Sequence, residues 1–372
     1  MHGGVNMKAY FQTEKYKRYC FAIARRARKR RRQRKVSIRI LRQVLLGKDT
    51  NSASRIRDFA DYKLHVVAPV DCCFLTNIEE VTTFINKLEE HRAARSRVFV
   101  VLKKVEKFDY AAISVLLSVM STFKLERTGF NGDFPANREA RKLIVESGFF
   151  DHINRKRSEK EEDLGYIRGK DNQIFTHLNT NVVPELGLPI LEQASTTVCG
   201  EKKANGGLHS VLMELMQNTN NHAASGIKGE KHWWLSVNHN AVNKLVSFSF
   251  IDHGVGVLTS LDRKPPSSRW HRAVQNAAKT FGIESNENFI EALLSGKIHQ
   301  TVTKKSYRGK GLPNIKRMLD FNKIGNLQII TNNVYANVAK KEYRLLNQDF
   351  KGTFFYWELS SENEFKPWTI IS

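Results

Sequence analysis

Cysteine is scarce in this chain of 372 residues: there are four, with no Cys-x-x-Cys pair and no Cys/His spacing of the zinc-binding type. This scarcity excludes a disulfide framework and predicts reduced cysteines that pack as small hydrophobic side chains. Long apolar runs are also missing, since none approaches the roughly 20 residues that a membrane-spanning helix needs. The first residues lack the pattern of a signal peptide. We therefore expect a cytoplasmic protein with no membrane segment.

Acidic residues are outnumbered by basic ones, 37 Asp and Glu against 60 Lys and Arg, which gives a net charge of +23. The excess is concentrated in residues 1–63, which hold 19 Lys and Arg but only 4 Asp and Glu. Hydrophobic residues make up 41% of the chain and aromatic residues 10%, which is enough apolar side chain to form cores. The length predicts two or three domains rather than one.

The pattern along the chain predicts a basic arm over 1–63, an α/β domain over 64–152, a charged linker over 153–172 and an α+β domain over 173–372. Within 64–152, β-branched apolar runs alternate with helical patterns, which is typical of an α/β layer fold. Asp109 is predicted to cap the helix over 110–123, and Gly148 to end the helix that begins near residue 137.

The basic arm contains the run RRARKRRRQRK, in which nine of eleven positions are cationic. Such a run predicts salt-sensitive, weakly sequence-selective contacts with a nucleic-acid backbone. Docking to an acidic protein, a targeting signal or a solvated tail explains the same charge. The residues predicted to contact nucleic acid are Arg25, Arg26, Arg28, Lys29, Arg30, Arg31, Arg32, Arg34 and Lys35.

A predicted helix over about 205–223 has two distinct sides. Its apolar stripe is expected to face a sheet, and consists of Leu208, Val211, Leu212 and Leu215. Glu214, Asn218 and His222 are spaced by four and project together from another side. A carboxylate, an amide oxygen and an imidazole in one column fit a hydrated Mg²⁺ and a phosphate chain, with the carboxylate as a general base. A solvated helix face is the structural alternative.

Two glycine-containing segments follow. In the first, FSFIDHGVGV, an apolar strand runs into Asp252, which is followed by Gly254 and Gly256. A buried carboxylate there can accept a hydrogen bond from an exocyclic amine, and the glycines let a planar ring approach the backbone. An ordinary strand-to-turn exit explains the same residues.

The second segment is YRGKGLPNIKRML, in which a glycine turn begins an amphipathic helix. Free N–H groups and the positive end of a helix dipole at such a turn attract anions. The alternative is a capping loop with incidental basic residues. The residues predicted to contact phosphate are Arg308, Gly309, Lys310, Gly311 and Leu312.

Together and in this order, ELMQNTNNH, DHGVG and GKGL resemble the N box and the two glycine boxes of the GHKL superfamily of ATPases and kinases. The resemblance covers roughly residues 200–360 and implies a Bergerat-type α/β sandwich that binds ATP and Mg²⁺. It implies Glu214 as the catalytic base, Asn218 as the Mg²⁺ ligand and Asp252 as the adenine reader. Thr353, in GTFFYWEL, falls at the late threonine that supports this aspartate. Residues 258–307 then correspond to the long ATP lid, either a mobile cover or a packed subdomain.

Residues 64–150 resemble, more faintly, the STAS domain of anti-sigma-factor antagonists, in VFVVLKKVEKFDYAAISVLL and NREARKLIVESGFF. In that family a phosphoacceptor serine directly follows the aspartate. Here Asp109 is followed by Tyr110, Ala111 and Ala112, and Ser114 lies a turn further on. The resemblance therefore implies a docking or scaffold domain more readily than a phosphorylated one.

These features predict an Mg-ATP-binding regulatory protein with slow ATPase activity, which couples lid closure to the STAS-like domain or to a protein partner, with nucleic acid as a further partner. One alternative is a serine/threonine protein kinase of the anti-sigma type. Another is a nucleic-acid-binding adaptor that uses ATP as a switch ligand. The oligomeric state stays open, a dimer included.

Overall fold

The computed structural model describes residues 62–154, 174–179, 182–222, 233–262, 279–280, 283–298 and 311–368. The chain divides after Tyr62, and the unit Lys63–Ser372 contains every element described below. Residues 1–61 of the predicted basic arm and most of the predicted linker lie outside the described residues. No helix in the described ranges combines the length and the apolar character needed to cross a membrane.

Residues 64–154 form a small layer of strands and helices, here called the α/β module. Its parallel sheet has the order β1-β3-β5, with a separate parallel pair of β2 and β4. The alternation of strands and helices predicted from the sequence is confirmed. The strands are β1 (Leu64–Val67), β2 (Asp71–Cys72), β3 (Val98–Val101), β4 (Lys107–Phe108) and β5 (Phe130–Gly132). The helices are α3 (Ile78–Ala93), α4 (Tyr110–Leu125), α5 (Arg138–Glu146) and α6 (Phe149–Asn154).

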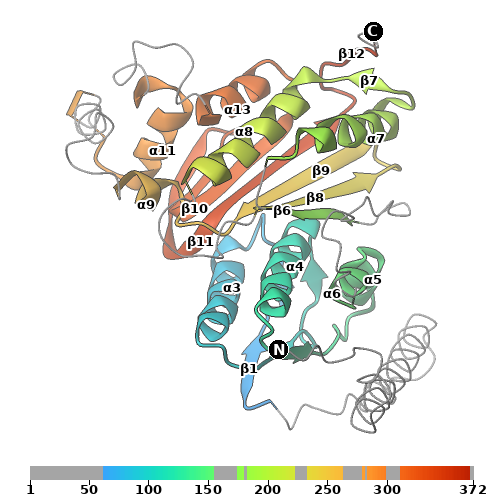
Figure 1. The fold of residues 1–372 in the computed structure, drawn as a ribbon, viewed down its shortest axis with the longest axis vertical. Coiled ribbons are helices and arrows are strands. Elements are labelled where there is room, and N and C mark those ends of the chain that lie inside the picture. Colours follow the sequence, from blue (N-terminus) through green and yellow to red (C-terminus); the bar gives the residue numbers. More distant parts are fainter. Residues whose placement is uncertain are drawn as a thin grey trace, which may run out of the picture. The chain divides into compact units, whose positions relative to one another are not determined.

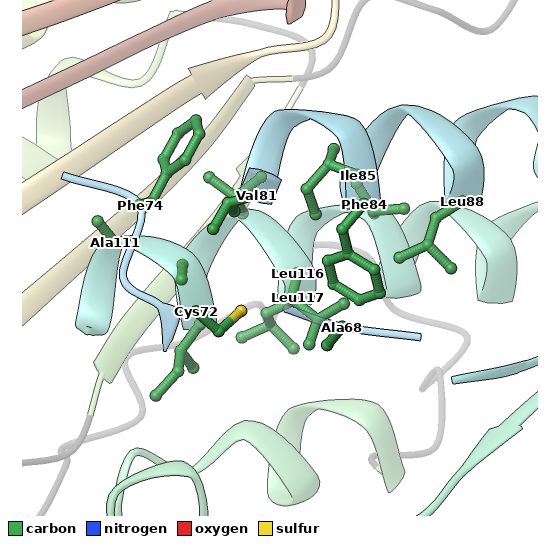
Figure 2. Packing of buried hydrophobic residues seen from close by; sticks show 14 of the residues in the cluster. Ala68, Cys72, Phe74, Val81, Phe84, Ile85, Leu88, Ala111, Leu116 and Leu117 are labelled. Carbon is green, nitrogen blue, oxygen red and sulfur yellow. The ribbon is translucent and has the colours of Figure 1, made fainter. Parts of the chain in front are cut away.

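Helix α4 begins as predicted, because the Asp109 carboxylate accepts a hydrogen bond from the Ala112 N–H at 2.6 Å. The same carboxylate accepts the Leu75 N–H at 3.0 Å, which ties the helix start to the loop after β2. Burial raises the pKa of Asp109. Apolar side chains of α3 meet those of α4 beside Cys72 (Figure 2). The Phe74 ring points away from them, toward strands from the second half of the chain. Cys72 is a buried free thiol, as expected, whereas Cys73 is half-buried.

The second half of the chain forms a five-stranded antiparallel sheet in the order β10-β11-β9-β8-β6. The sequence runs HWWLSVNH and KLVSFSFIDHG predict a hairpin. The β8–β9 register confirms it, since Trp233 lies opposite Asp252 and Asn240 opposite Leu245. The run GTFFYWEL predicts a last strand, and it is the end of β11. The strands are β6 (Ile174–Asn179), β8 (Trp233–Asn240), β9 (Leu245–Asp252), β10 (Gly325–Asn337) and β11 (Glu342–Ser360). A short pair joins β7 (Lys203–Ala204) to β12 (Lys366–Pro367).

Helices cover one face of this sheet (Figure 1). The strand side chains on that face, such as Trp233, Phe248 and Trp357, share a core with them. The helices are α7 (Gly187–Cys199, after the 3₁₀ turn Pro184–Leu186), α8 (Gly206–His222), α9 (Val257–Asp262), α11 (Asn286–Leu294) and α13 (Gly311–Asp320). The chain is thus a mixed α/β protein, as the sequence predicts at this level.

The α/β module packs against the opposite face. Trp234, Ile251 and Phe354 alternate with the residues of the first face and belong to the same core cluster as α3 and α4. Side chains alternate between the two faces of a strand, and here both faces are apolar. The module and the larger sheet therefore share one hydrophobic core.

Candidate functional site

The predicted column on α8 lies against the start of α13. Asn314 donates a hydrogen bond from Nδ2 to Glu214 Oε1 at 2.6 Å, across 100 residues of sequence. A Cβ added to Gly311 would lie 2.8 Å from Asn218 Nδ2, so a larger residue at this helix start would displace the Asn218 amide. Glu214 and Asn218 are half-buried. The structure thus brings the acid, the amide and a helix N-terminus together.

Asp252 ends β9 next to the same helix. Burial raises the pKa of Asp252 to about 6, and the polar Gly254 backbone and Thr219 side chain beside it act in the opposite direction. Thr219 directly follows Asn218 on α8, so the strand end and the α8 column are adjacent. The Oδ1 atom of Asp252 is buried, and none of the described residues donates a hydrogen bond to it. A buried acceptor without a donor is costly, and a ligand N–H would relieve that cost.

Thr353 lies beside Asp252 because the two are partners in the β9–β11 register. Its hydroxyl is 3.2 Å from that of Thr331 on β10. Gly352, just before it, has φ +122°, and an added Cβ would lie 2.0 Å from the Asp252 carbonyl oxygen. The backbone of β11 can approach Asp252 this closely only at a glycine.

We expect Gly352→Ala to destabilise the protein by at least about 2 kcal/mol more than Gly148→Ala, from backbone strain plus the clash with Asp252. Gly148 is a matched control, since it has φ +78° but no neighbouring heavy atom within 4 Å of an added Cβ. Urea unfolding of the two variants tests this. Equal losses would show that the close approach at Gly352 contributes nothing to stability.

The loop after Asp252 is held by two side chains of β10. Thr331 accepts the Val257 N–H at 2.9 Å. Asn332 accepts the Leu258 N–H at 3.0 Å and donates to the Val255 carbonyl at 3.0 Å. Gly256, with φ +80°, lies in this loop beside Asn332. These contacts fix the turn that contains the predicted first glycine box.

Five residues of the site were missed by the sequence analysis: Thr219, Asn314, Thr331, Asn332 and Gly352. Thr219 has a signal in hindsight, since it lies inside the α8 motif. Thr331 and Asn332 have none, because polar residues near a strand bulge look like ordinary surface positions. A register shift does occur between them in the β10–β11 ladder.

Several predicted residues cannot be placed. His222 is the last residue of α8, and its side chain lies outside the described residues, as do Arg308, Gly309 and Lys310. The cationic run from Arg25 to Lys35 is outside them as well. Leu312 is half-buried in the first turn of α13 and packs against the core beneath α8.

The predicted lid is described only in part. Its helix α11 buries Ile290, Leu293 and Leu294 in the core shared with α8 and α13, so this portion is a packed subdomain. Residues 263–278, 281–282 and 299–307 of the lid lie outside the described ranges.

Ser114 in the STAS-like region is only 1% exposed, and its hydroxyl donates to the Tyr110 carbonyl at 2.7 Å. Buried and bonded inside α4, it is inaccessible to a phosphoryl donor in this conformation. A docking role for the module fits this arrangement.

The site has features that suit a nucleotide and a hard metal ion. Asp252 Oδ1 is an unpaired buried acceptor, and the ten-residue helix α13 starts beside the Asn218 amide. Within the described ranges no three His, Cys, Asp or Glu side chains are grouped to hold a metal. Mg²⁺ bound to phosphates takes few protein ligands, and the Asn218 amide oxygen could be one of them. No family model, curated protein or solved structure matches this chain.

Proposed function

We propose that this chain binds Mg-ATP in the C-terminal half, hydrolyses it slowly, and couples lid closure over the nucleotide to the α/β module or a protein partner. The observation that supports this most is the buried, donor-free Oδ1 of Asp252 beside the Glu214–Asn218 column and the start of α13. These residues come from segments far apart in sequence, so their convergence is not a by-product of local structure. Their order is also the order of the motifs that resemble the GHKL superfamily.

Each residue has a distinct part in this proposal. Asp252 Oδ1 accepts a hydrogen bond from the exocyclic amine of adenine, and Gly254 leaves room for the ring. The N-terminus of α13 faces the phosphates with free N–H groups. Asn218 holds Mg²⁺ through its amide oxygen, and the ion, when bound, neutralises phosphate charge. Glu214 takes a proton from the attacking water while Asn314 keeps its carboxylate oriented.

Loss of Asn218 provides the direct test. We expect Asn218→Ala to weaken ATP binding in the presence of Mg²⁺ by about 10–100-fold, as losses at metal sites do, and to leave Mg²⁺-free binding unchanged. Calorimetric titration with ATP and a non-hydrolysable analogue measures both. The exposed neighbour Gln217 supplies the control, since Gln217→Ala removes a side-chain amide but leaves that of Asn218 in place. A wild-type protein that binds neither compound would refute the proposal.

Asp252 predicts a pH dependence of stability. The pKa of Asp252 is raised from 3.8 to about 6 in the folded protein. The contribution of this group to the free energy of unfolding is therefore greatest below pH 4 and is lost as the pH rises through 6. That loss amounts to at most about 3 kcal/mol. We therefore expect Asp252→Asn to gain stability relative to wild type between pH 4 and pH 7. Urea unfolding at both pH values measures this gain, and Asp349→Asn, at an exposed position of β11, controls for the change in charge. A difference independent of pH would contradict the burial of the ionised carboxylate.

A further inference from the structure

The two paired residues at the nucleotide site each have a neighbour that contacts the α/β module. Asp252 and Thr353 face each other across β9 and β11. Successive side chains point to opposite faces of a sheet, so the next residue of each segment turns to the module side. His253 Nε2 lies 3.0 Å from the Ser118 hydroxyl of α4. The Phe354 ring meets the Phe74 ring edge-on, with centroids 4.9 Å apart.

Both contacts lead to the same helix. Ser118 lies in the middle of α4 and is 2% exposed. Phe74 precedes Leu75, whose N–H is bound by Asp109, the residue that caps α4. Helix α4 is therefore connected at its start to the Thr353 segment and at its middle to the Asp252 segment.

Helix α3 also contacts strand β11, which contains Thr353. Asn86 donates to the Asp349 carbonyl at 2.7 Å, three residues before Gly352. The Glu79 carboxylate accepts the Asn347 N–H at 3.2 Å and pairs with Arg344 at 3.4 Å. These bonds anchor the module to the part of β11 that leads to Gly352 and Thr353.

We infer that Ser118 and His253 are positioning residues that link the nucleotide site to the α/β module, an inference that rests on the proposed function. A ligand that engages Asp252 changes the position of the adjoining loop, and His253 moves with that loop. The partly buried hydrogen bond to Ser118 must then shift or break, and either change involves α4. A partner that binds the module and displaces α4 would therefore change the affinity for the nucleotide. By linkage, the nucleotide would change the affinity for that partner by the same factor.

The test compares two serines one turn apart on α4. Ser118→Ala removes the bond to His253, whereas Ser114→Ala removes an equally buried hydroxyl that bonds only to its own helix in the described structure. We expect Ser118→Ala to weaken Mg-ATP binding about tenfold, the effect of removing one hydrogen bond. Ser114→Ala should stay within about twofold of wild type, inside the range of ordinary small effects. His253→Gln, which keeps a hydrogen-bonding amide near the same place, should retain most of the affinity.

Hydrogen exchange of α4 amides supplies a second readout that a merely structural serine would not alter. Mg-ATP should increase protection of α4 in wild type and in Ser114→Ala, but not in nucleotide-saturated Ser118→Ala. Unchanged affinity and unchanged protection in Ser118→Ala would overturn this inference and leave the proposed function standing. A wild-type protein that binds no nucleotide would overturn both. If Ser118→Ala does not fold, His253→Ala answers the same question from the other side of the bond.

Discussion

Glu214→Gln is expected to lower the rate of ATP hydrolysis by about 10²–10⁴-fold, the usual contribution of a general base. Gln keeps the size of the side chain and still offers an oxygen to the Asn314 amide, which lies 2.6 Å from Glu214 Oε1. It cannot take a proton from water. The affinity for a non-hydrolysable ATP analogue should therefore stay within about threefold of wild type, since transition-state and ground-state interactions separate in this way.

Phosphate release under single-turnover conditions measures the effect of Glu214→Gln, with Gln217→Ala as the control on the same helix. Labelled γ-phosphate separates the outcomes further, because a protein kinase would transfer the label to protein. If Glu214→Gln releases phosphate as fast as wild type, Glu214 has no catalytic role even where nucleotide binding is intact.

Phe354→Ala is expected to reduce the free energy of unfolding by about 3–5 kcal/mol, the usual loss for a buried phenylalanine. Phe354 is fully buried between the larger sheet and the α/β module, and its ring packs edge-on against Phe74. Because this core is shared, the α/β module and the sheet should lose stability together. Leu345→Ala, on the same strand but 47% exposed, should change stability by less than about 0.5 kcal/mol.

Urea unfolding followed by tryptophan fluorescence and by far-ultraviolet circular dichroism tests the shared core. The five-stranded sheet contains Trp233, Trp234 and Trp357, and residues 62–154 contain no tryptophan. Fluorescence thus reports on the sheet and, through Trp234, on its interface with the module. Coincident transitions that shift together in Phe354→Ala would support one cooperative unit. A Phe354→Ala variant whose sheet melts early while the module melts as in wild type would contradict it.

Local patterns determined much of the secondary structure. The period of the apolar residues predicted the helix that became α8, within one residue at each end, and the hairpin of β8 and β9. The Asp109 cap of α4 was also readable, because capping depends on residues two or three positions apart. Such features involve interactions within one element or across one turn, and sequence spacing describes these well.

The partners of each surface were decided only by the tertiary structure. Helix α4 is buried almost throughout, and its apolar sequence does not indicate which segments bury it. That it bonds to His253 and packs near Phe354 depends on contacts across more than 130 residues. In the same way Thr219, Asn314 and Thr331 reach the Asp252 site through strand register and helix packing. The amino-acid sequence determined which segments form helices and strands, because that choice depends on local spacing. Which side chains meet at the site depends on how those segments pack, and spacing along the chain does not contain that information.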